Sequence, residues 1–548
     1  MRCLQVHVSA PSPRRVQARA RRDPGFRYLR RVHPAQPEVR EGRRHRDSSP
    51  VAPVKGSVVE DLATLKNTWR AVAAVPISES FDMVVIGAGP GGEKAAAQAA
   101  FFGKRVAIVE RQAAPGGALV SSAGVPTKTL RETALYLTGY RRREVYGLSI
   151  QLDPDATLDR LMDRTAQVQA AMTDQVRENI TRHQIEMVRG TGRLAPNRTV
   201  VVTPVGRNGA PRTLQADIVL IATGSRPFHP RDVPFDDPEV YDSERILGID
   251  RIPRSMVVVG GGPVGCEYAS IFTSLGTEVT LLDSGERLLP FMDGEISRLL
   301  GATFSGMGMR LVLGSGVGAV RRANGELRVT LESGEVIRPE KVLFAAGRAG
   351  NTEGLGLEEA SVQIDARGRI IVDEEFQTTA QGVYAAGDVI GPPALASVSM
   401  EQGRVAACHA FGIPFKEAVD PLPPYGVYSI PEVAMVGLTE EAATTQGVGY
   451  EVGRGWFSRN IKAVVDGGTD GLVKLVFRRE DRVLLGVHVL GDIASELIHQ
   501  GQAVMHEGGV IDRFIRATFN VPTRSEAYKY AAYDGLQRLA GLPGAPSG

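Results

Sequence analysis

A strand, a glycine-rich turn, a helix and a second strand follow one another in residues 81–111, and this unit restricts the fold more than any other feature. An apolar run meets Gly87, Gly89 and Gly92 in GxGxxG spacing, a small-residue helix follows, and a second apolar run ends at Glu110. The first glycine permits a tight turn, the second lets the backbone approach a pyrophosphate, and the third lets the helix pack on the strand. The helix N-terminus then faces the phosphates, and the terminal acid accepts a hydrogen bond from a ribose hydroxyl. The unit therefore predicts a dinucleotide-binding site.

The same unit occurs again in residues 254–284, with Gly260, Gly262 and Gly265 in the turn and Asp283 at the end of the second strand. In both copies the acid lies 23 positions after the first glycine. A repeated unit predicts a repeated structure, so we expect an α/β protein with two Rossmann-like domains and two bound dinucleotides. A flavin and a nicotinamide are the usual pair in one chain, because the flavin accepts hydride from the nicotinamide.

Length and charge limit the remaining possibilities. With 548 residues the chain is too long for one hydrophobic core, and about three domains are expected. No apolar run approaches the roughly 20 residues of a membrane span, so no membrane partner is expected. Residues 1–50 carry 13 arginines and 4 acidic residues, a net +9, so the total of +2 leaves −7 for the remainder. A mildly acidic body gives no support for nucleic-acid binding.

The arginine-rich tail, residues 1–50, has neither the apolar core of a secretory signal nor a helical period. Its composition is compatible with an organelle transit peptide or with a tether to an anionic surface. A disordered extension over residues 1–77 is the favoured interpretation.

We expect a protein that lacks residues 1–77 to keep its flavin content and its turnover, because the first dinucleotide motif begins only at Phe81. Flavin absorbance per protein and steady-state rate, measured for the truncated and the full-length protein side by side, test this. Loss of flavin in the truncated protein alone would contradict it.

The order of the motifs predicts the domain organisation. We expect residues 78–228 and 351–421 to form the FAD-binding domain in two parts, and residues 229–350 to form the NAD(P)-binding domain. Residues 422–548 contain no phosphate loop and are expected to form an α+β interface domain.

Several elements can be placed within these domains. Apolar residues at helical spacing from Leu158 to Ile180 predict a long helix, and we interpret its apolar stripe as core packing rather than as the border of a ligand site. The other expected elements are a loop at residues 116–128 that enters a helix, a strand pair at 186–202, buried strands at 218–222 and 383–388, a hairpin at 471–491, and helices from Ser495 and Ser525.

Two of the predicted strands end in residues suited to a ligand. Thr223 and Gly224 follow one strand and are expected to turn the backbone tightly over the first dinucleotide. Asp388 closes the segment VYAAGD, and a carboxylate at the C-terminal edge of a parallel sheet is expected to hold a ribityl hydroxyl rather than only to cap a helix.

Longer motifs make a family resemblance specific. Across about residues 80–540 the chain resembles the flavoprotein disulfide reductase superfamily of lipoamide dehydrogenase and glutathione reductase in both fingerprints and in GGALVSSAGVPTK, ATGSRP, VYAAGD and FNVPTRSEAY. Within that superfamily, GCEYASIF, GRAGNT, LASVSMEQGR and ELIHQGQAV look most like the soluble, Si-specific NAD(P)+ transhydrogenases. The resemblance implies FAD as cofactor and NAD(H) and NADP(H) as substrates, with Gly116, Gly117 and Gly347 at the nucleotide sites.

The chain departs from the disulfide reductases at their redox centre. Where those enzymes carry two cysteines in CxxxxC spacing, this chain has Leu119 and Gly124, and where they carry the histidine that serves the thiol it has Val521. Glu526, which would orient that histidine, remains and is interpreted as structural. Without a thiolate, electrons cannot pass from flavin to a disulfide. The resemblance therefore implies that the oxidant reacts at the flavin itself.

The resemblance also implies a hydride-transfer site. Lys128 stands where the family places a lysine near flavin N5, and Glu267 corresponds to its ion-pair partner. A cation there would stabilise the reduced flavin anion, while the carboxylate would hold the lysine in place. NADPH would then give hydride to FAD and leave, and NAD+ would take the same site to collect it, without a general base.

Other functions stay open at this point. Asp283 favours a free ribose 2′-hydroxyl and repels the 2′-phosphate of NADP(H), although Arg287, four residues on, could compensate. If Asp283 dominates, the protein could be an NADH dehydrogenase with a quinone or dye as acceptor. A disulfide reductase with other thiols and a non-catalytic flavoprotein scaffold are further alternatives, and the intact loops at both nucleotide sites argue against the scaffold.

The cysteines and histidines predict neither a disulfide nor a metal site. Cys3, Cys266 and Cys408 are far apart in the sequence, which suits the reducing cytoplasm. His499 and His506 are seven positions apart and have no further ligands at suitable spacing. Finally, the resemblance implies a homodimer through the C-terminal domain, whose twofold axis would bring residues 519–526 to the partner's flavin.

Overall fold

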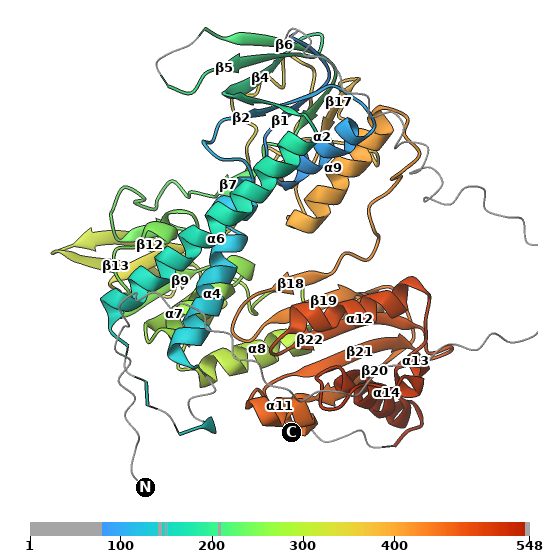
Figure 1. Cartoon of the computed structure of the whole chain (residues 1–548). Coiled ribbons are helices and arrows are strands. Elements are labelled where there is room, and N and C mark those ends of the chain that lie inside the picture. Colours follow the sequence, from blue (N-terminus) through green and yellow to red (C-terminus); the bar gives the residue numbers. More distant parts are fainter. Residues whose placement is uncertain (1–78, 141–144, 148, 151, 207–209, 543–548) are drawn as a thin grey trace, which may run out of the picture. The chain divides into compact units, whose positions relative to one another are not determined.

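The structure, a computed structural model, describes residues 79–140, 145–147, 149–150, 152–206 and 210–542 (Figure 1). The arginine-rich segment at residues 1–77, expected to be disordered, lies outside the described residues. Within the described ranges, no helix combines the length and the apolar character that a bilayer span requires. Three sheets of five or more strands organise these residues.

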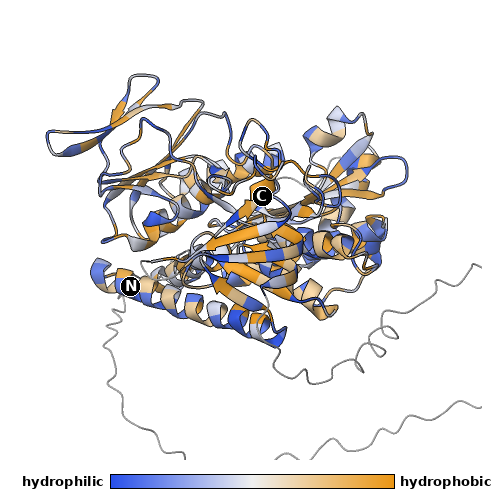
Figure 2. Ribbon diagram, turned by 90° about the horizontal axis from the view of Figure 1, so that it is seen from above, coloured by the Kyte–Doolittle hydropathy of each residue, from blue (hydrophilic) through white to orange (hydrophobic). Residues whose placement is uncertain are grey.

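The first sheet is centred on β1 (Ser80–Ile86), in which Met83, Val84 and Val85 are fully buried. In spatial order its strands are β3 (Glu186–Arg189), β2 (Val106–Glu110), β1, β6 (Arg212–Ile221), β5 (Thr199–Thr203) and β4 (Thr191–Ala195), with β17 (Val383–Ala385) on the edge of β6. The strands β3, β2, β1, β6 and β17 are parallel, and β4 and β5 extend the sheet in antiparallel fashion. Figure 2 shows sheet strands coloured largely as apolar, which is typical of parallel strands buried on both faces.

Each sheet with its helices is called a unit, the first, second and third in the order of the sheets. Helices α2 (Pro90–Phe101) and α9 (Ala396–Ala410) pack side by side in the first unit, although the whole second sheet separates them in sequence (Figure 1). Glycines permit this contact, because a Cβ on Gly403 would lie 2.2 Å from the carbonyl oxygen of Gly91. The chain therefore returns to its first sheet through β17 and α9.

The long helix expected around Leu158 and Ile180 is confirmed as α6 (Pro154–Arg182). Its N-terminus is capped by Asp153, whose carboxylate accepts hydrogen bonds from the backbone N–H groups of Asp155 and Ala156 at 3.0 and 3.2 Å. Proline at the first helical position suits this start, because its missing N–H would have no partner there. In Figure 1, α6 runs from the first sheet towards the second.

The second sheet is fully parallel. Its strands, in spatial order, are β8 (Val240–Asp242), β15 (Lys341–Phe344), β9 (Ser255–Val259), β10 (Glu278–Asp283) and β11 (Arg310–Leu313). Helices α7 (Pro263–Ser274) and α8 (Gly294–Gly306) follow β9 and β10 in the chain, and β12 (Val317–Ala323), β13 (Glu326–Leu331) and β14 (Val336–Ile337) form an antiparallel meander. The two connections to the first unit, β7 (Ser225–Pro227) and β16 (Arg348–Gly350), pair with each other.

The third sheet is antiparallel. Its order is β18 (Tyr425–Val427), β19 (Val433–Gly437), β22 (Leu484–Leu490), β21 (Leu472–Arg478) and β20 (Tyr450–Trp456), so the hairpin expected at 471–491 is confirmed as β21 and β22. The accompanying helices are α10 (Glu440–Thr445), α11 (Ile461–Asp466), α12 (Ala494–His506), α13 (Asp512–Arg516) and α14 (Glu526–Leu539). The helices expected from Ser495 and Ser525 correspond to α12 and α14.

Three local expectations need correction. Residues 116–128 are not a plain loop but contain α3 (Gly117–Ser121) and the start of α4 (Val125–Thr138). The pair expected at 186–202 is three strands, of which β3 joins β2 and only β4 and β5 form a hairpin. The strand expected at 383–388 ends at Ala385, because the positive φ of Gly387 (+84°) turns the backbone into a 3₁₀ turn.

A buried ion cluster joins the second and third sheets. The ammonium group of Lys474 on β21 lies 2.6 Å from Asp293 and 2.9 Å from Glu295, both at the start of α8, and also contacts Glu440 of α10. These three carboxylates converge as metal ligands could, but Lys474 lies against each of them and supplies the positive charge. Burial would raise the pKa of Glu295, yet the hydrogen bond from Arg454 and the charge of Lys474 lower it below 4.5.

We expect Lys474→Met to reduce the free energy of unfolding by about 3–5 kcal/mol at neutral pH, because it leaves buried carboxylates without their cation. Glu295 stabilises the folded state above pH 4.5 and loses that contribution as the pH falls through its lowered folded-state pKa. The difference between variant and wild type should therefore shrink in acid. Denaturant unfolding of both proteins at neutral and acidic pH measures it, and equal stability at neutral pH would contradict the role of Lys474.

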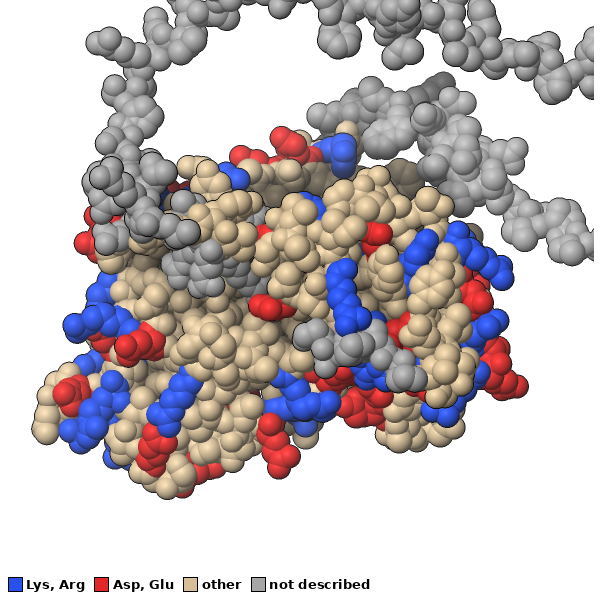
Figure 3. Space-filling model, turned by 90° about the horizontal axis from the view of Figure 1, so that it is seen from below, with Lys and Arg blue, Asp and Glu red and all other residues tan. Residues whose placement is uncertain are grey.

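Acidic and basic side chains are interspersed on the face of the molecule in Figure 3. Among the described residues on that face, no extended field of blue side chains of the kind that contacts a phosphate backbone is visible.

Candidate active site

The first glycine turn is fixed by close backbone contacts at Gly87 and by hydrogen bonds to the carboxylate of Glu110. Gly87 has φ of +109°, and a Cβ there would lie 2.4 Å from the carbonyl oxygen of Ala222, so only glycine fits. The turn leads into α2, whose N-terminus faces the loop. Glu110, at the end of β2, accepts hydrogen bonds from the N–H groups of Ala88 at 2.8 Å and Gln112 at 2.7 Å. The carboxylate is thus fixed beside the turn.

The second turn repeats this geometry. Gly260 has φ of +114°, and a Cβ there would lie 2.6 Å from the carbonyl oxygen of Ala345. Asp283 accepts from the N–H of Gly261, as Glu110 does from the residue after its first glycine, and from the N–H of Gly285 at 2.6 Å. The two predicted sites therefore have the same construction.

The third glycine of each turn is required by the fold itself. A Cβ on Gly92 would lie 2.0 Å from the carbonyl oxygen of Gly87, and one on Gly265 would lie 1.8 Å from that of Gly260. Each helix therefore approaches its own turn as closely as the backbone permits.

The second glycine of each turn is not required by contacts within the chain. Gly262 has negative φ, and a Cβ built on it meets no atom within 4 Å, while one on Gly89 meets only the Cα of Gly117 at 3.8 Å. The chain itself would accept a side chain at both places. Open space in front of a helix N-terminus, beside a fixed carboxylate, fits the pyrophosphate and ribose of a dinucleotide at each site.

Gly116 and Gly117 bring the next segment onto the first turn. The N–H of Gly116 donates to the carbonyl oxygen of Ala88 at 2.8 Å, and a Cβ on Gly117 would lie 2.7 Å from the Cα of Gly89. This contact places α3 and the start of α4 beside the first dinucleotide turn.

Thr223, Gly224 and Gly347 lie directly before β7 and β16, the paired strands that connect the first and second sheets. The side chain of Thr223 donates to the carbonyl oxygen of Asn351 at 2.8 Å, and the side-chain amide of Asn351 donates back at 2.9 Å. Gly224 and Gly347 both have positive φ, +68° and +120°. Asn351 was not predicted as a site residue, although it stands in the quoted segment GRAGNT.

Asp388 lies in the 3₁₀ turn after β17 and not at the end of the strand. One carboxylate oxygen accepts from the hydroxyl of Ser225 at 2.6 Å, and that hydroxyl oxygen accepts from the guanidinium of Arg348 at 2.8 Å. Ser225 and Arg348 belong to the two crossing strands β7 and β16, so the interdomain connection fixes the carboxylate. Its second oxygen carries no hydrogen bond among the described contacts.

The ion pair between Lys128 and Glu267 joins the two units. Lys128 lies in the first turn of α4, and its ammonium is 3.0 and 2.9 Å from the two carboxylate oxygens of Glu267 on α7. Glu267 is 7% exposed and Lys128 31% exposed, so the cation keeps an open side. The N–H of Tyr428 donates to the same carboxylate at 3.0 Å, and the Tyr428 ring lies 4.9 Å from the ammonium. Tyr428 was missed, since no local pattern marks it.

Leu119 and Gly124 lie together where the resemblance places the two thiols. A Cβ on Gly124 would lie 2.5 Å from the leucine Cδ1 and 2.6 Å from its carbonyl oxygen. The leucine therefore leaves no room for a side chain at position 124.

The described cysteines are not reactive in this environment. Cys266 and Cys408 are both buried and unpaired. Burial, together with the negative charges of Glu267 and Asp283, raises the pKa of the Cys266 thiol far above its usual range, and burial also raises that of Cys408. Neither is a thiolate at neutral pH, and Cys3 lies outside the described residues.

The remaining predicted positions are not among the residues that contact the ion pair in the described part of the chain. Val521 is 54% exposed, and Glu526 begins α14, where a helix N-terminus favours an acid. His499 contacts Gln502, and His506 contacts Asp420.

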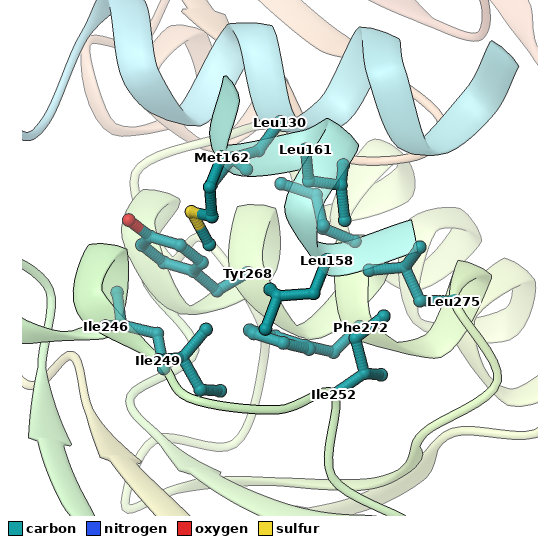
Figure 4. A pocket seen from close by; sticks show the side chains of 11 residues that line it. Leu130, Leu158, Leu161, Met162, Ile246, Ile249, Ile252, Tyr268, Phe272 and Leu275 are labelled. Carbon is teal, nitrogen blue, oxygen red and sulfur yellow. The ribbon is translucent and has the colours of Figure 1, made fainter. Parts of the chain in front are cut away.

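An apolar cavity of about 20 Å³ lies where α4 and α6 pack against α7 (Figure 4). Its lining includes Leu130, Leu158, Leu161, Tyr268 and Phe272. It is too small for a nucleotide and offers almost no polar surface. The apolar stripe of α6 is therefore core packing, as expected.

Two family models match the chain. The model of pyridine nucleotide-disulphide oxidoreductases matches residues 81–403, and that of the dimerisation domain of these proteins matches residues 423–532. A soluble pyridine nucleotide transhydrogenase from Mycobacterium tuberculosis is 44% identical over 462 residues, 84% of this chain and 98% of the relative. One from Marinomonas sp. is 37% identical over 462 residues, 84% of this chain and 99% of the relative.

Solved structures give the same fold. LpdA from Mycobacterium tuberculosis superposes with a TM-score of 0.75 at 28% identity, over 82% of this chain and 99% of that one. The HOCl-induced flavoprotein disulfide reductase RclA from Escherichia coli gives a TM-score of 0.74 at 25% identity, over 82% and 99%.

Proposed function

Since the chain belongs to the pyridine nucleotide-disulphide oxidoreductase family, we propose that it transfers hydride between NADPH and NAD+ through bound FAD, as a pyridine nucleotide transhydrogenase. One observation supports transhydrogenase activity in particular, rather than the disulfide reduction of other family members. Where the family carries its redox disulfide, Leu119 packs against Gly124, so neither position offers a thiol to receive electrons from the flavin. The relatives named as transhydrogenases, which share most of the chain's length, support this proposal.

In the proposed enzyme, each turn holds one dinucleotide. Gly87, Gly89, Gly92 and Glu110 would hold FAD together with a second set of residues, namely Gly116, Gly117, Thr223, Gly224 and Asp388. Gly260, Gly262, Gly265, Asp283 and Gly347 would hold the nicotinamide substrate. The bound flavin would supply a two-electron carrier between the two nicotinamides.

The chain's own contribution is charge and position. The open side of the Lys128 ammonium would stabilise negative charge at the reaction centre, and Glu267 holds it from the second unit. Because the pair joins α4 to α7, it would also help to hold the two proposed dinucleotide sites at a fixed distance. No general base is required, since a hydride moves without an accompanying proton between the nicotinamides.

Anaerobic mixing with NADPH tests the proposal. The flavin band should bleach after one equivalent, and thio-NAD+ should restore it with formation of thio-NADH. Uptake of four electrons per flavin, or loss of turnover after thiol alkylation, would show a redox disulfide and overturn the proposal.

An NADH dehydrogenase is the second candidate, and the second turn favours it. Both oxygens of Asp283 are fixed by backbone N–H groups beside the ribose position, where a 2′-phosphate would meet their charge. Arg287, which could compensate, is held by Glu441 at 3.1 Å and by the carbonyl oxygen of Pro290 at 2.7 Å. Reoxidation by a quinone but not by NADP+ or thio-NAD+ would select this function.

A homodimer in the cytoplasm is part of the proposal. The dimerisation-domain match supports it, and apolar side chains are exposed on that domain. Ile461, Val464 and Val465 of α11 are 55–57% exposed, and Tyr530 of α14 is 54% exposed. Size-exclusion chromatography with light scattering should give a molar mass twice that of one chain. The mass of a single chain would refute the dimer.

A further inference from the structure

Arg131 is a buried cation that the proposed reaction does not use. It lies one helical turn after Lys128 on α4, and its side chain is only 4% exposed. The guanidinium donates to the carbonyl oxygen of Ser429 at 3.0 Å and pairs with Glu432 at 3.2 Å. A third contact reaches the neighbouring Glu132. Two of these partners therefore lie in the third unit, in the connection between β18 and β19.

The same connection also contacts Glu267, the acidic member of the ion pair with Lys128. The N–H of Tyr428 donates to Glu267 at 3.0 Å, and the N–H of Ile430 donates to the hydroxyl of Ser270, one turn further along α7, at 3.0 Å. The connection is in turn anchored at Glu432, which accepts from the N–H and the hydroxyl of Ser495 on α12. Residues 428–432 thus contact α4, α7 and α12.

These contacts form a closed ring. It runs from Lys128 to Glu267, from Glu267 to the backbone of Tyr428, and from Ser429 and Glu432 to Arg131, which returns to Lys128 along α4. We propose that Arg131 is a positioning residue for Lys128, which acts by locking residues 428–432 so that Tyr428 and Glu267 hold the ammonium. This inference rests on the proposed hydride transfer.

The chemistry of the side chains explains why an arginine stands there. The planar guanidinium presents several donors in a fixed fork, so it can hold a carbonyl oxygen and a carboxylate at once. A lysine offers a point charge on a flexible stem and cannot keep both contacts in fixed directions. Reaction rates respond to small displacements of a charged group, so loss of this lock should affect the chemical step more than substrate binding.

A double-mutant cycle tests the inference. Arg131→Met, Lys128→Met and the double variant are compared with wild type by anaerobic stopped-flow, with the rate of flavin bleaching by saturating NADH as the readout. Arg131→Met alone should slow bleaching by about tenfold at nearly unchanged KM for NADH, while adding it to Lys128→Met should change the rate less than about twofold. Arg131→Lys should recover part of the rate.

A matched control separates positioning from general damage. Lys341→Met removes a likewise buried cation of β15, whose ion-pair partners Glu239 and Asp250 lie neither on α4 nor in residues 428–432. It should lower the thermal midpoint and leave the bleaching rate unchanged. If Arg131→Met does not fold, Glu432→Gln replaces it in the cycle, with a smaller effect in the same non-additive pattern.

The outcomes are distinct. Equal slowing by the Arg131 or Glu432 change in the presence and absence of Lys128 would show a merely structural role and overturn the inference. No bleaching of the wild-type flavin by either NADH or NADPH would instead refute the proposed function.

Discussion

Lys128→Met should slow the bleaching of the flavin by NADH or NADPH by roughly 10²-fold or more, with little change in flavin content. The reason is that a preorganised charge at a reaction centre typically contributes this much. The ammonium is held by both oxygens of Glu267 and keeps an open side, so its removal takes away charge without opening the core. Anaerobic stopped-flow at the flavin band measures the rate directly.

Lys416→Met is the matched control for this change. Its ammonium also pairs with one glutamate, Glu401, and its side chain is 31% exposed, the same as that of Lys128. Its partner Glu401 is on α9, which carries none of the predicted site residues, so the bleaching rate should stay that of wild type. An unchanged rate in Lys128→Met would remove Lys128 from the mechanism.

The second glycines of the two turns should give opposite phenotypes when changed to alanine. We expect Gly89→Ala to be purified without flavin and Gly262→Ala to keep its flavin but lose about 10²-fold in kcat/KM for NADH. Neither Cβ would clash within the chain, so both variants should fold. The losses would arise only where a dinucleotide pyrophosphate approaches the backbone.

Gly301→Ala, within α8 of the second unit, serves as the control. Its Cβ would make only an ordinary contact, at 3.6 Å from Leu311, and alanine suits a helix interior better than glycine. Flavin absorbance per protein and steady-state kinetics with NADH check all three variants. Loss of flavin in Gly262→Ala, or its retention in Gly89→Ala, would contradict the assignment of the two sites.

The position of Asp388 shows the limit of reading elements from local pattern. The apolar run before it was correctly predicted as a buried strand, but the strand stops at Ala385. Gly387 takes a positive φ that a strand does not use, and Ser225 and Arg348 hold the carboxylate from two other strands. Sequence indicated that an acid stands at this edge of the sheet, and the crossing strands decided how it is held.

The sequence by itself determined the two dinucleotide units, their glycine turns and terminal acids, and the missing thiols at Leu119 and Gly124. These features are local, because spacing within a strand, turn and helix is set by backbone sterics and by apolar periodicity. Only the tertiary structure decided that Tyr428 supports Glu267 and that Arg131 holds the segment around it. Those contacts join residues as far apart as 298 positions, and they exist because elements around the three sheets pack against one another. Such packing depends on the shapes of complete units, which no short stretch of sequence specifies.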